Sequence, residues 1–425
     1  MHCSRQKTKK KENDVMEMKE LARQNFDEAA AIVKEVTQET KLLYSEFFTE
    51  KTGNEVYIKP ENLQRTGAYK VRGAYYTISQ LSDEDKQKGL VTASAGNHAQ
   101  GVAYAAKLAG IPATIVMPVT TPLIKVNRTK KLGANVVLHG DVFDQAMAHA
   151  NKLAEEHGYT LVHPFNDLRV ATGQGSIAKE ILDELPDADY ILVPVGGGGL
   201  CAGISTYAKM LNPNIKVIAV EPAGAACLKG ALEAGHVVTV SPINTIADGT
   251  AVQTLGDKLL PYIKENIDEL ITIEDSELAQ CFLELAENHK IIAENSGLLT
   301  IAALSHLECK GKKVVSVISG GNMDVLVMAN VVLNGLLQRD RIFTVSVMVQ
   351  DKPGKLAALT ALLGQNQANI IKLDHNVYAN VNRAAGVQVV CTLEAFGTEH
   401  KEQIIEALEK EGFCPKLEKT SNIYM

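Results

Sequence analysis

The segment Tyr190-Ile191-Leu192-Val193-Pro194-Val195 runs directly into Gly196-Gly197-Gly198-Gly199-Leu200, and this junction is the most informative feature of the chain. Its first part is apolar, as a buried parallel strand should be, and a helix is expected over Leu200 to Leu211. The first N–H groups of a helix have no partner within the helix, and the helix dipole makes that end positive. Because glycine has no Cβ, the backbone here can approach a bulky anion closely. The junction therefore predicts a phosphate-binding turn.

A flexible linker or an ordinary strand-to-helix turn is the alternative interpretation. Linkers mix glycine with serine and other polar residues, whereas this glycine run has hydrophobic segments on both sides. Neither GxGxxG nor GxxxxGK[ST] fits the spacing, so the sequence indicates a phosphate ligand without pointing to a nucleotide.

Strand and helix patterns alternate along most of the chain on either side of this turn. Strands are expected at 57–59, 91–93, 113–117, 135–138, 161–162, 190–193, 216–220 and 313–318. Helices are expected at 26–36, 97–109, 123–132, 143–156, 175–184 and 200–211, with two more between 220 and 313. Such alternation predicts an α/β fold of parallel sheets covered by helices on both faces.

The pattern changes after residue 338, where Arg339-Asp340-Arg341 interrupts the apolar periodicity. Strands are expected at 342–349, 370–377, 387–393 and 415–418, and helices at 355–364 and 399–410. This βαββαβ order predicts a small split βαβ sandwich at 341–420. We expect residues 1–25 to form a disordered basic extension, since the cluster Arg5 to Lys11 is polar and is followed by acidic residues.

Length and composition narrow the functional classes. A chain of 425 residues is expected to contain more than one domain. The net charge of −7 argues against nucleic acid as a partner, and no apolar run reaches the roughly 18 residues of a membrane span. The N-terminus lacks the apolar segment of a secretory signal. The 7 cysteines include no CxxC pair, so we expect reduced thiols and neither disulfides nor a zinc site, in a soluble cytoplasmic protein.

Three further motifs lie where a strand gives way to a turn or helix. They are Thr66-Gly67-Ala68-Tyr69-Lys70-Val71-Arg72-Gly73, Ser94-Ala95-Gly96-Asn97-His98-Ala99-Gln100-Gly101 and Ser319-Gly320-Gly321-Asn322. Because ligands of α/β proteins bind at the carboxyl ends of strands, we expect these motifs to meet. Together with the glycine turn, the set resembles fold type II pyridoxal-phosphate enzymes, and within them the threonine dehydratases (threonine ammonia-lyases). The resemblance covers residues 26–338 and implies two parallel-sheet lobes, the smaller one, about 58–157, inserted in the larger.

The resemblance implies a role for each motif. Lys70 would form the Schiff base with pyridoxal 5'-phosphate, although Ala68-Tyr69-Lys70 stands where the family usually has Ser-Phe-Lys. Asn97 would bind the phenolic oxygen of the cofactor, and Gly196, Gly197, Gly198, Gly199 and Leu200 would bind its phosphate. The loop of Ser94, Ala95, Gly96, Asn97 and His98 would hold the substrate carboxylate, although such a stretch can also be a simple N-cap.

Ser319 would face the pyridine nitrogen in this family, although an isolated Ser-Gly-Gly-Asn is also a common turn. A hydroxyl leaves that nitrogen unprotonated, which weakens the electron sink and favours β-elimination over transamination. Racemases of the group carry a serine at the position of Ala95 as a second acid/base, so a lyase is favoured. Some relatives bind a divalent metal; Glu221 and Ala225 match that pattern but Cys227 replaces the acid, so we expect no metal.

The resemblance thus implies deamination of L-threonine to 2-oxobutanoate and ammonia, and of L-serine to pyruvate, in a homo-oligomer, with a tetramer favoured. The turn Asp351-Lys352-Pro353-Gly354-Lys355-Leu356 resembles that of an ACT regulatory domain, which implies control by an amino acid, isoleucine or valine, as at the first step of isoleucine biosynthesis. A catabolic dehydratase and an amino-acid sensor that has lost catalysis remain the alternatives.

Overall fold

The computed structural model describes residues 20–376 and 386–420, so most of the expected N-terminal extension lies outside the described residues. The described residues form two compact units. The first consists of 20–281 and 285–324, and the second of 282–284, 325–376 and 386–420. We expected the catalytic region to reach residue 338, but helix α14 (Val325–Gln338) groups with the second unit.

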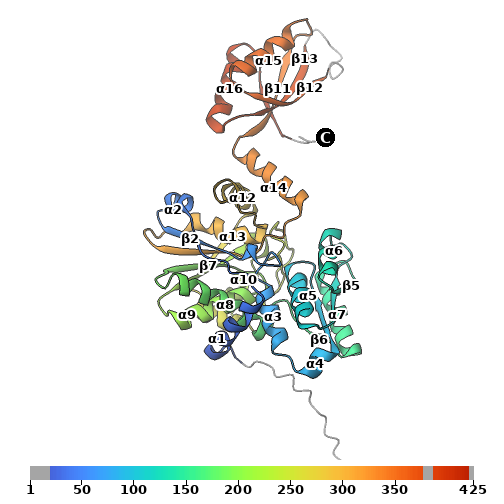
Figure 1. The fold of residues 1–425 in the computed structure, drawn as a ribbon. Coiled ribbons are helices and arrows are strands. Elements are labelled where there is room, and N and C mark those ends of the chain that lie inside the picture. The colour runs from blue at the N-terminus through green and yellow to red at the C-terminus, as the bar shows by residue number, and fades with distance from the viewer. Residues whose placement is uncertain (1–19, 377–385, 421–425) are drawn as a thin grey trace, which may run out of the picture. The chain divides into compact units, whose positions relative to one another are not determined.

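The larger lobe of the first unit contains a six-stranded sheet in the order β1-β2-β10-β7-β8-β9. Its strands are β1 (Leu43–Tyr44), β2 (Glu55–Pro60), β7 (Tyr190–Pro194), β8 (Lys216–Pro222), β9 (Glu269–Ile273) and β10 (Lys313–Ile318). All neighbouring pairs are parallel except β1 with β2. The helices of this part of the chain are α1 (Arg23–Ile32), α2 (Glu46–Thr52), α3 (Val71–Ser79), α8 (Leu168–Glu184), α9 (Gly199–Leu211), α10 (Cys227–Ala234), α11 (Leu260–Asn266), α12 (Asp275–His289) and α13 (Asn295–Ala303). Figure 1 shows α13 on one side of the sheet and α8 and α9 on the other.

The smaller lobe contains a four-stranded parallel sheet in the order β5-β4-β3-β6. Its strands are β3 (Leu90–Ala93), β4 (Ala113–Met117), β5 (Asn135–Leu138) and β6 (Thr160–Leu161), and its helices are α4 (Asp83–Lys88), α5 (Asn97–Ala109), α6 (Leu123–Lys131) and α7 (Phe143–His157). Ile115 and Met117 belong to one hydrophobic cluster and Val116 to another. Successive residues of β4 are therefore buried on opposite faces, which requires helices on both.

The predicted α/β class is confirmed, and several boundaries need correction. The expected lobe of 58–157 is shifted, because β2 belongs to the large sheet and β6 to the small one. Helix α1 begins at Arg23 and not at residue 26, and Leu21 is already buried, so ordered structure starts inside the expected extension. Helix α8 extends seven residues further back than the predicted 175–184. Strand β9 was missed, and four helices, α10 to α13, replace the two expected after β8.

The second unit has the predicted βαββαβ order after α14. Its elements are β11 (Ile342–Val349), α15 (Lys355–Gln365), β12 (Asn369–Asn376), β13 (Val387–Glu394), α16 (Thr398–Lys410) and β14 (Lys416–Glu418). The strands form an antiparallel sheet in the order β12-β13-β11-β14. Val345 and Val389 of the sheet and Leu359 and Ile404 of the helices belong to one buried cluster. This cluster is the core that holds the two helices on the sheet. The end of the predicted strand 370–377, at residue 377, lies outside the described residues.

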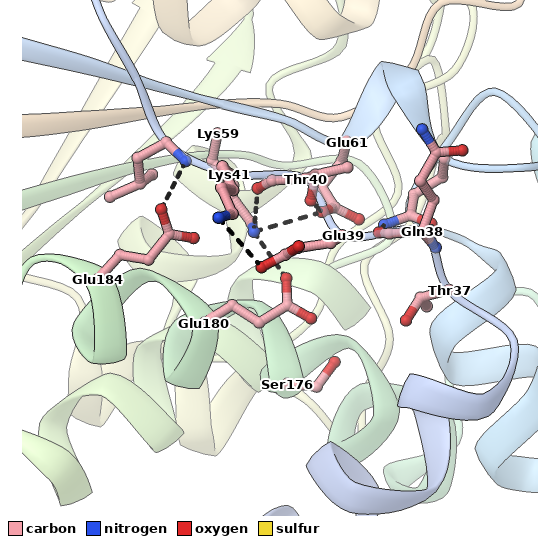
Figure 2. Close-up of polar contacts among 12 residues, drawn as sticks. Thr37, Gln38, Glu39, Thr40, Lys41, Lys59, Glu61, Ser176, Glu180 and Glu184 are labelled. Atoms are coloured by element: carbon pink, nitrogen blue, oxygen red, sulfur yellow. Dashed lines mark hydrogen bonds and ion pairs between the residues drawn. The ribbon is translucent and has the colours of Figure 1, made fainter.

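A buried network of charges joins β2, α3 and α8. Arg72 of α3 is fully buried, and its guanidinium donates to Glu61 (2.7 and 2.8 Å), to Glu180 (2.6 and 2.8 Å) and to Ser176 Oγ (3.1 Å). Lys59 Nζ donates to Glu180 Oε2 and to the carbonyl of Thr40, both at 2.6 Å, as Figure 2 shows. The network pairs two cations with two carboxylates, which is the arrangement that buried charges require. It anchors α3 immediately after Lys70.

Candidate active site

The four sequence motifs meet at one cavity in the first unit. The cavity has a volume of about 620 Å³. It is lined by all the residues that the sequence singled out as site residues: Lys70, Ser94, Ala95, Gly96, Asn97, His98, Gly196, Gly197, Gly198, Gly199, Leu200 and Ser319. The lining also includes Tyr69, Pro164, Phe165, Thr250, Glu294 and Asn322. Three motifs follow the carboxyl ends of β2, β10 and β7, which are adjacent parallel strands of the six-stranded sheet, and the fourth follows β3 of the four-stranded sheet. The cavity therefore lies at the carboxyl ends of strands from both sheets.

Lys70 lies directly before α3, at the end of the segment that leaves β2. Its Nζ donates to the carbonyl oxygen of Pro164 at 2.9 Å. Burial disfavours the ammonium and lowers the pKa of Lys70 to about 8, against an opposing effect of the negative charge on Glu294. A lysine with this pKa is partly unprotonated at neutral pH and can therefore act as a nucleophile and a base.

The glycine turn packs so closely against neighbouring residues that side chains would clash there. A Cβ on Gly197 would lie 2.2 Å from Cγ of Phe165, and one on Gly196 would lie 2.9 Å from Cα of Thr250. Gly198 has a φ of +94°, which side chains other than glycine rarely tolerate. Helix α9 begins at Gly199, so its positive end faces the cavity that the turn lines. The turn is thus a narrow, positively polarised cradle of backbone.

A chain of amides and a carboxylate fixes the orientation of Asn97. Asn322 Nδ2 donates to the carbonyl of Thr66 at 2.7 Å and to Asn97 Oδ1 at 2.9 Å. Asn97 Nδ2 in turn donates to Glu294 Oε1 at 2.6 Å. Burial raises the pKa of Glu294 to about 7, with a further increase from the charge on Asp248. Since one hydrogen of the Asn97 amide is used by Glu294, the other remains for a ligand in the cavity.

The loop before α5 presents a helix N-terminus to the same cavity, because α5 begins at Asn97. Gly96 N–H donates to Ser94 Oγ at 3.3 Å, which is a local turn before the helix. The N-cap of α5 is Gly96, and no side chain caps it, so the structure does not support the N-cap alternative for Ser94. His98 is buried with Nε2 3.1 Å from the carbonyl of Val162. Burial, together with the charge on Lys70, lowers the pKa of His98 to about 3, so this imidazole is neutral.

The fourth motif, Ser319 to Asn322, contacts the segment that contains Lys70. Ser319 follows β10 directly, and its carbonyl accepts a hydrogen bond from the Tyr69 amide at 3.1 Å. Gly321 N–H donates to the Gly67 carbonyl at 2.9 Å. A Cβ on Gly320 would lie 2.4 Å from Glu294 Oε1. These contacts place Ser319 and Lys70 on the lining of one cavity although they are far apart in sequence.

The side chains that match a metal-binding pattern only in part form other contacts. Both carboxylate oxygens of Glu221 accept backbone N–H groups, from Leu228 (2.9 Å) and Lys229 (2.8 Å). The thiol of Cys227 donates to the carbonyl of Gly196 at 3.5 Å. Within residues 20–376 and 386–420, no three His, Cys, Asp or Glu side chains lie together as a metal site would require. In the same ranges, no helix has the length and apolar character needed to cross a membrane.

Comparison with known proteins places this geometry in a family. A model described as "Pyridoxal-phosphate dependent enzyme" matches residues 33–320. The chain belongs to this family of pyridoxal-phosphate-dependent enzymes. It is 42% identical to an L-threonine ammonia-lyase of Thermotoga maritima over 92% of this chain and 98% of that protein. It is 41% identical to an L-threonine ammonia-lyase of Geobacter sulfurreducens over 91% of this chain and 97% of that protein.

Solved structures of family members are similar as well. The processed form of threonine deaminase isoform 2 from Solanum lycopersicum matches with a TM-score of 0.71 and 40% identity, over 73% of this chain and 92% of that one. Maize serine racemase matches with a TM-score of 0.70 and 33% identity, over 75% of this chain and 98% of that one. The fold type II architecture predicted from sequence is thereby confirmed.

The residues present fit the family's cofactor. Pyridoxal phosphate needs a phosphate site, an amine for its aldehyde and a donor near its phenolic oxygen. The Gly196–Gly199 cradle would hold the phosphate, and a Cβ on Gly196, Gly197 or Gly198 would lie less than 3.0 Å from a neighbouring atom. The amine of Lys70, with its lowered pKa, would bind the aldehyde, and the amide of Asn97 would donate to the phenolic oxygen.

The sequence reasoning missed Glu294, Thr250 and the segment 163–167, which all border or support the cavity. None lies in a glycine-rich motif, although the segment 163–167 follows the strand that the sequence predicted at 161–162 and could have been found from that position. Asn322 was quoted only as part of a turn, and its contact with Asn97 gives it a definite place in the site.

Proposed function

We propose that this protein catalyses the pyridoxal-phosphate-dependent deamination of L-threonine to 2-oxobutanoate and ammonia, with L-serine, which would yield pyruvate, as a second substrate. The observation that carries the proposal is the convergence of Lys70, Asn97, Ser319 and the Gly196–Gly199 cradle on one cavity. The named L-threonine ammonia-lyases that resemble the chain over almost their whole length support the choice of substrate.

In this proposal the bound cofactor supplies an electron sink for the substrate's Cα. Lys70 would hold the cofactor through its amine and, once the substrate's amine has replaced it there, would remove the α-proton, a role for which the lowered pKa of about 8 suits the freed amine. The Gly196–Gly199 cradle would hold the phosphate, and Asn97 would donate to the phenolic oxygen. Ser319 would donate its hydroxyl hydrogen to the pyridine nitrogen, which would leave that nitrogen unprotonated and favour elimination.

The loop of Ser94 to His98 would bind the substrate carboxylate at the N-terminus of α5. Ala95, within this loop, has no group that could exchange a proton on the opposite face of the substrate. A lyase is therefore favoured over a racemase, although serine racemases are among the similar structures.

The second unit would bind an amino-acid effector, isoleucine or valine, and control the catalytic unit of a homo-oligomer, most simply a tetramer. The split βαβ sandwich of β11 to β14 supports this part of the proposal by its topology alone. Biosynthetic threonine dehydratases of Staphylococcus aureus among the similar proteins favour a role at the start of isoleucine synthesis. We place the enzyme in the cytoplasm.

The test is release of 2-oxo acid from threonine and serine, with and without isoleucine or valine, combined with the visible absorbance of the holoenzyme. Lys70→Ala should abolish both turnover and the absorbance of the bound cofactor, whereas Lys107→Ala, on the exposed face of α5, should change neither. Normal turnover by Lys70→Ala would contradict the assignment. A wild-type protein without absorbance or turnover would instead support a sensor that has lost catalysis.

A further inference from the structure

The short segment from His163 to Asp167 connects β6 with α8 and touches the two most important parts of the cavity. The carbonyl of Pro164 accepts the hydrogen bond from Lys70 Nζ at 2.9 Å. The ring of Phe165 lies where a Cβ on Gly197 would fall, at 2.2 Å, and its backbone carbonyl would lie 3.2 Å from a Cβ on Gly199. The shape of this segment therefore determines both where the lysine amine rests and how tightly the glycine cradle is supported.

The imidazole of His163 shapes the segment. Its Nδ1 accepts hydrogen bonds from the amides of Phe165 (3.3 Å) and Asn166 (2.9 Å), which closes a tight turn around Pro164. The rings of His163 and Phe165 meet edge to face, with their centroids 4.9 Å apart and an angle of 88° between them. Two donors at one nitrogen require that nitrogen to be unprotonated, so the neutral ring carries its proton on Nε2.

We propose that His163 is a positioning residue of the active site: its Nδ1, by accepting from the Phe165 and Asn166 amides, fixes the turn that aims the Pro164 carbonyl at Lys70 and sets the Phe165 ring against Gly197. This inference rests on the proposed function. It assigns a role in the site to a residue that none of the sequence motifs contains.

The surroundings of His163 keep it in the required neutral state. Burial lowers its pKa to about 4. Among the charged groups that act on it, Lys70 and Lys258 lower the pKa further, whereas Asp167 and Asp257 raise it. His98, which interacts with His163 electrostatically, is itself neutral at ordinary pH. The acceptor at Nδ1 is therefore available over the whole range in which Lys70 could act.

The chain offers a matched pair of substitutions at this position. Asparagine places an acceptor oxygen at the same number of bonds from Cα as Nδ1, whereas glutamine places it one bond further away. We expect His163→Asn to bind pyridoxal phosphate and to turn over threonine within about threefold of wild type. His163→Gln should lose about tenfold in cofactor affinity, which corresponds to about 1.4 kcal/mol, because the two hydrogen bonds at Nδ1 are lost or strained.

A spectroscopic readout separates positioning from general destabilisation. The pH midpoint of the cofactor's visible absorbance reports on the environment of Lys70, so it should move in His163→Gln and stay at the wild-type value in His163→Asn. Equal behaviour of the two variants, whether both resemble wild type or both are impaired, would overturn the proposal. A wild-type protein without cofactor absorbance would refute the proposed function instead, so the two failures are distinguishable.

Should His163→Gln fail to fold, hydrogen–deuterium exchange of the wild-type holoenzyme decides the matter. The amides of residues 165 and 166 should exchange at least about tenfold more slowly than free amides, because both are hydrogen-bonded to Nδ1. Exchange of both at the free rate would overturn the proposal.

Discussion

Removing the guanidinium of Arg72 should destabilise the first unit strongly. The side chain is completely buried, and its five hydrogen bonds go to Glu61, Glu180 and Ser176. Arg72→Met would leave two carboxylates facing the single cation of Lys59. Removal of one partner from a buried ion pair costs about 3–5 kcal/mol, and we expect a loss in this range because Glu61 is also fully buried.

The exposed pair of Lys152 and Glu156 on α7 provides the control. Both side chains are more than half exposed, at 65% and 52%, and their charged groups lie 3.7 Å apart. Lys152→Met should cost less than about 0.5 kcal/mol. The assay is urea unfolding followed by tyrosine fluorescence, which no tryptophan obscures in this chain. Of the 12 tyrosines, all but those at 378 and 424 precede residue 325, so the signal reports mainly on the first unit.

The pH dependence of the stability lost in Arg72→Met tests whether that loss is electrostatic. Burial alone would raise the pKa of Glu61, but the charge and hydrogen bonds of Arg72 outweigh burial and hold that pKa below its usual value. In the wild type, ionised Glu61 therefore stabilises the folded protein at pH values above the pKa that glutamate has in the unfolded chain. This stabilisation is lost as the pH falls through the lower pKa of Glu61 in the folded protein. Without Arg72 the sign reverses, because burial raises the folded pKa and the protonated carboxyl is then tolerated. The cost of Arg72→Met should thus be smaller at pH 5 than at pH 8.

A double substitution completes this test. Glu61→Gln removes the carboxylate that Arg72→Met leaves unpaired, so the double variant should be more stable than the sum of the single losses by at least about 1 kcal/mol. A loss of stability for Arg72→Met no larger than that for Lys152→Met, or a loss equal at both pH values, would contradict the assignment of these charges as a stabilising network.

Three further predictions concern the cavity. Gly197→Ala should weaken cofactor binding more than a hundredfold, since its Cβ would overlap the Phe165 ring. Gly364→Ala, whose Cβ would meet nothing within 4 Å, should leave binding unchanged, and equilibrium titration with pyridoxal phosphate measures both affinities. Capture of the cofactor by apoprotein should accelerate as the pH rises through about 8, where Lys70 loses its proton, and a flat stopped-flow rate between pH 6.5 and 9.5 would contradict this. Glu294→Gln should move that midpoint to lower pH, because burial lowers the pKa of Lys70 and the charge on Glu294 opposes it; an upward shift would show that another charge acts on the lysine.

The elements that sequence predicted best are those with strong local patterns. Strand β4 and helix α5 have the predicted limits, because a short apolar run bounded by Pro112 and Pro118 marks the strand and helical periodicity marks the helix. Strand β9 was missed since its sequence, Glu269-Leu-Ile-Thr-Ile273, is short and follows a helix with no clear turn. The start of α8 was misplaced because Gly173 and Gly175 suggest a break. In the structure they instead allow close contact, since a Cβ on Gly173 would meet Gly73 and one on Gly175 would meet Phe26.

Local sequence patterns were enough to identify the α/β alternation, the glycine cradle, and the lysine, asparagine and serine expected around a pyridoxal phosphate. Each of these depends on residues adjacent in the chain, whose chemistry and spacing need no partner to be recognised. The polar groups that support these residues could be found only from contacts between distant parts of the chain. Glu294 reaches Asn97 across 197 positions and the Pro164 carbonyl reaches Lys70 across 94, and burial at these contacts, which no local pattern encodes, shifts the pKa values of Glu294 and Lys70.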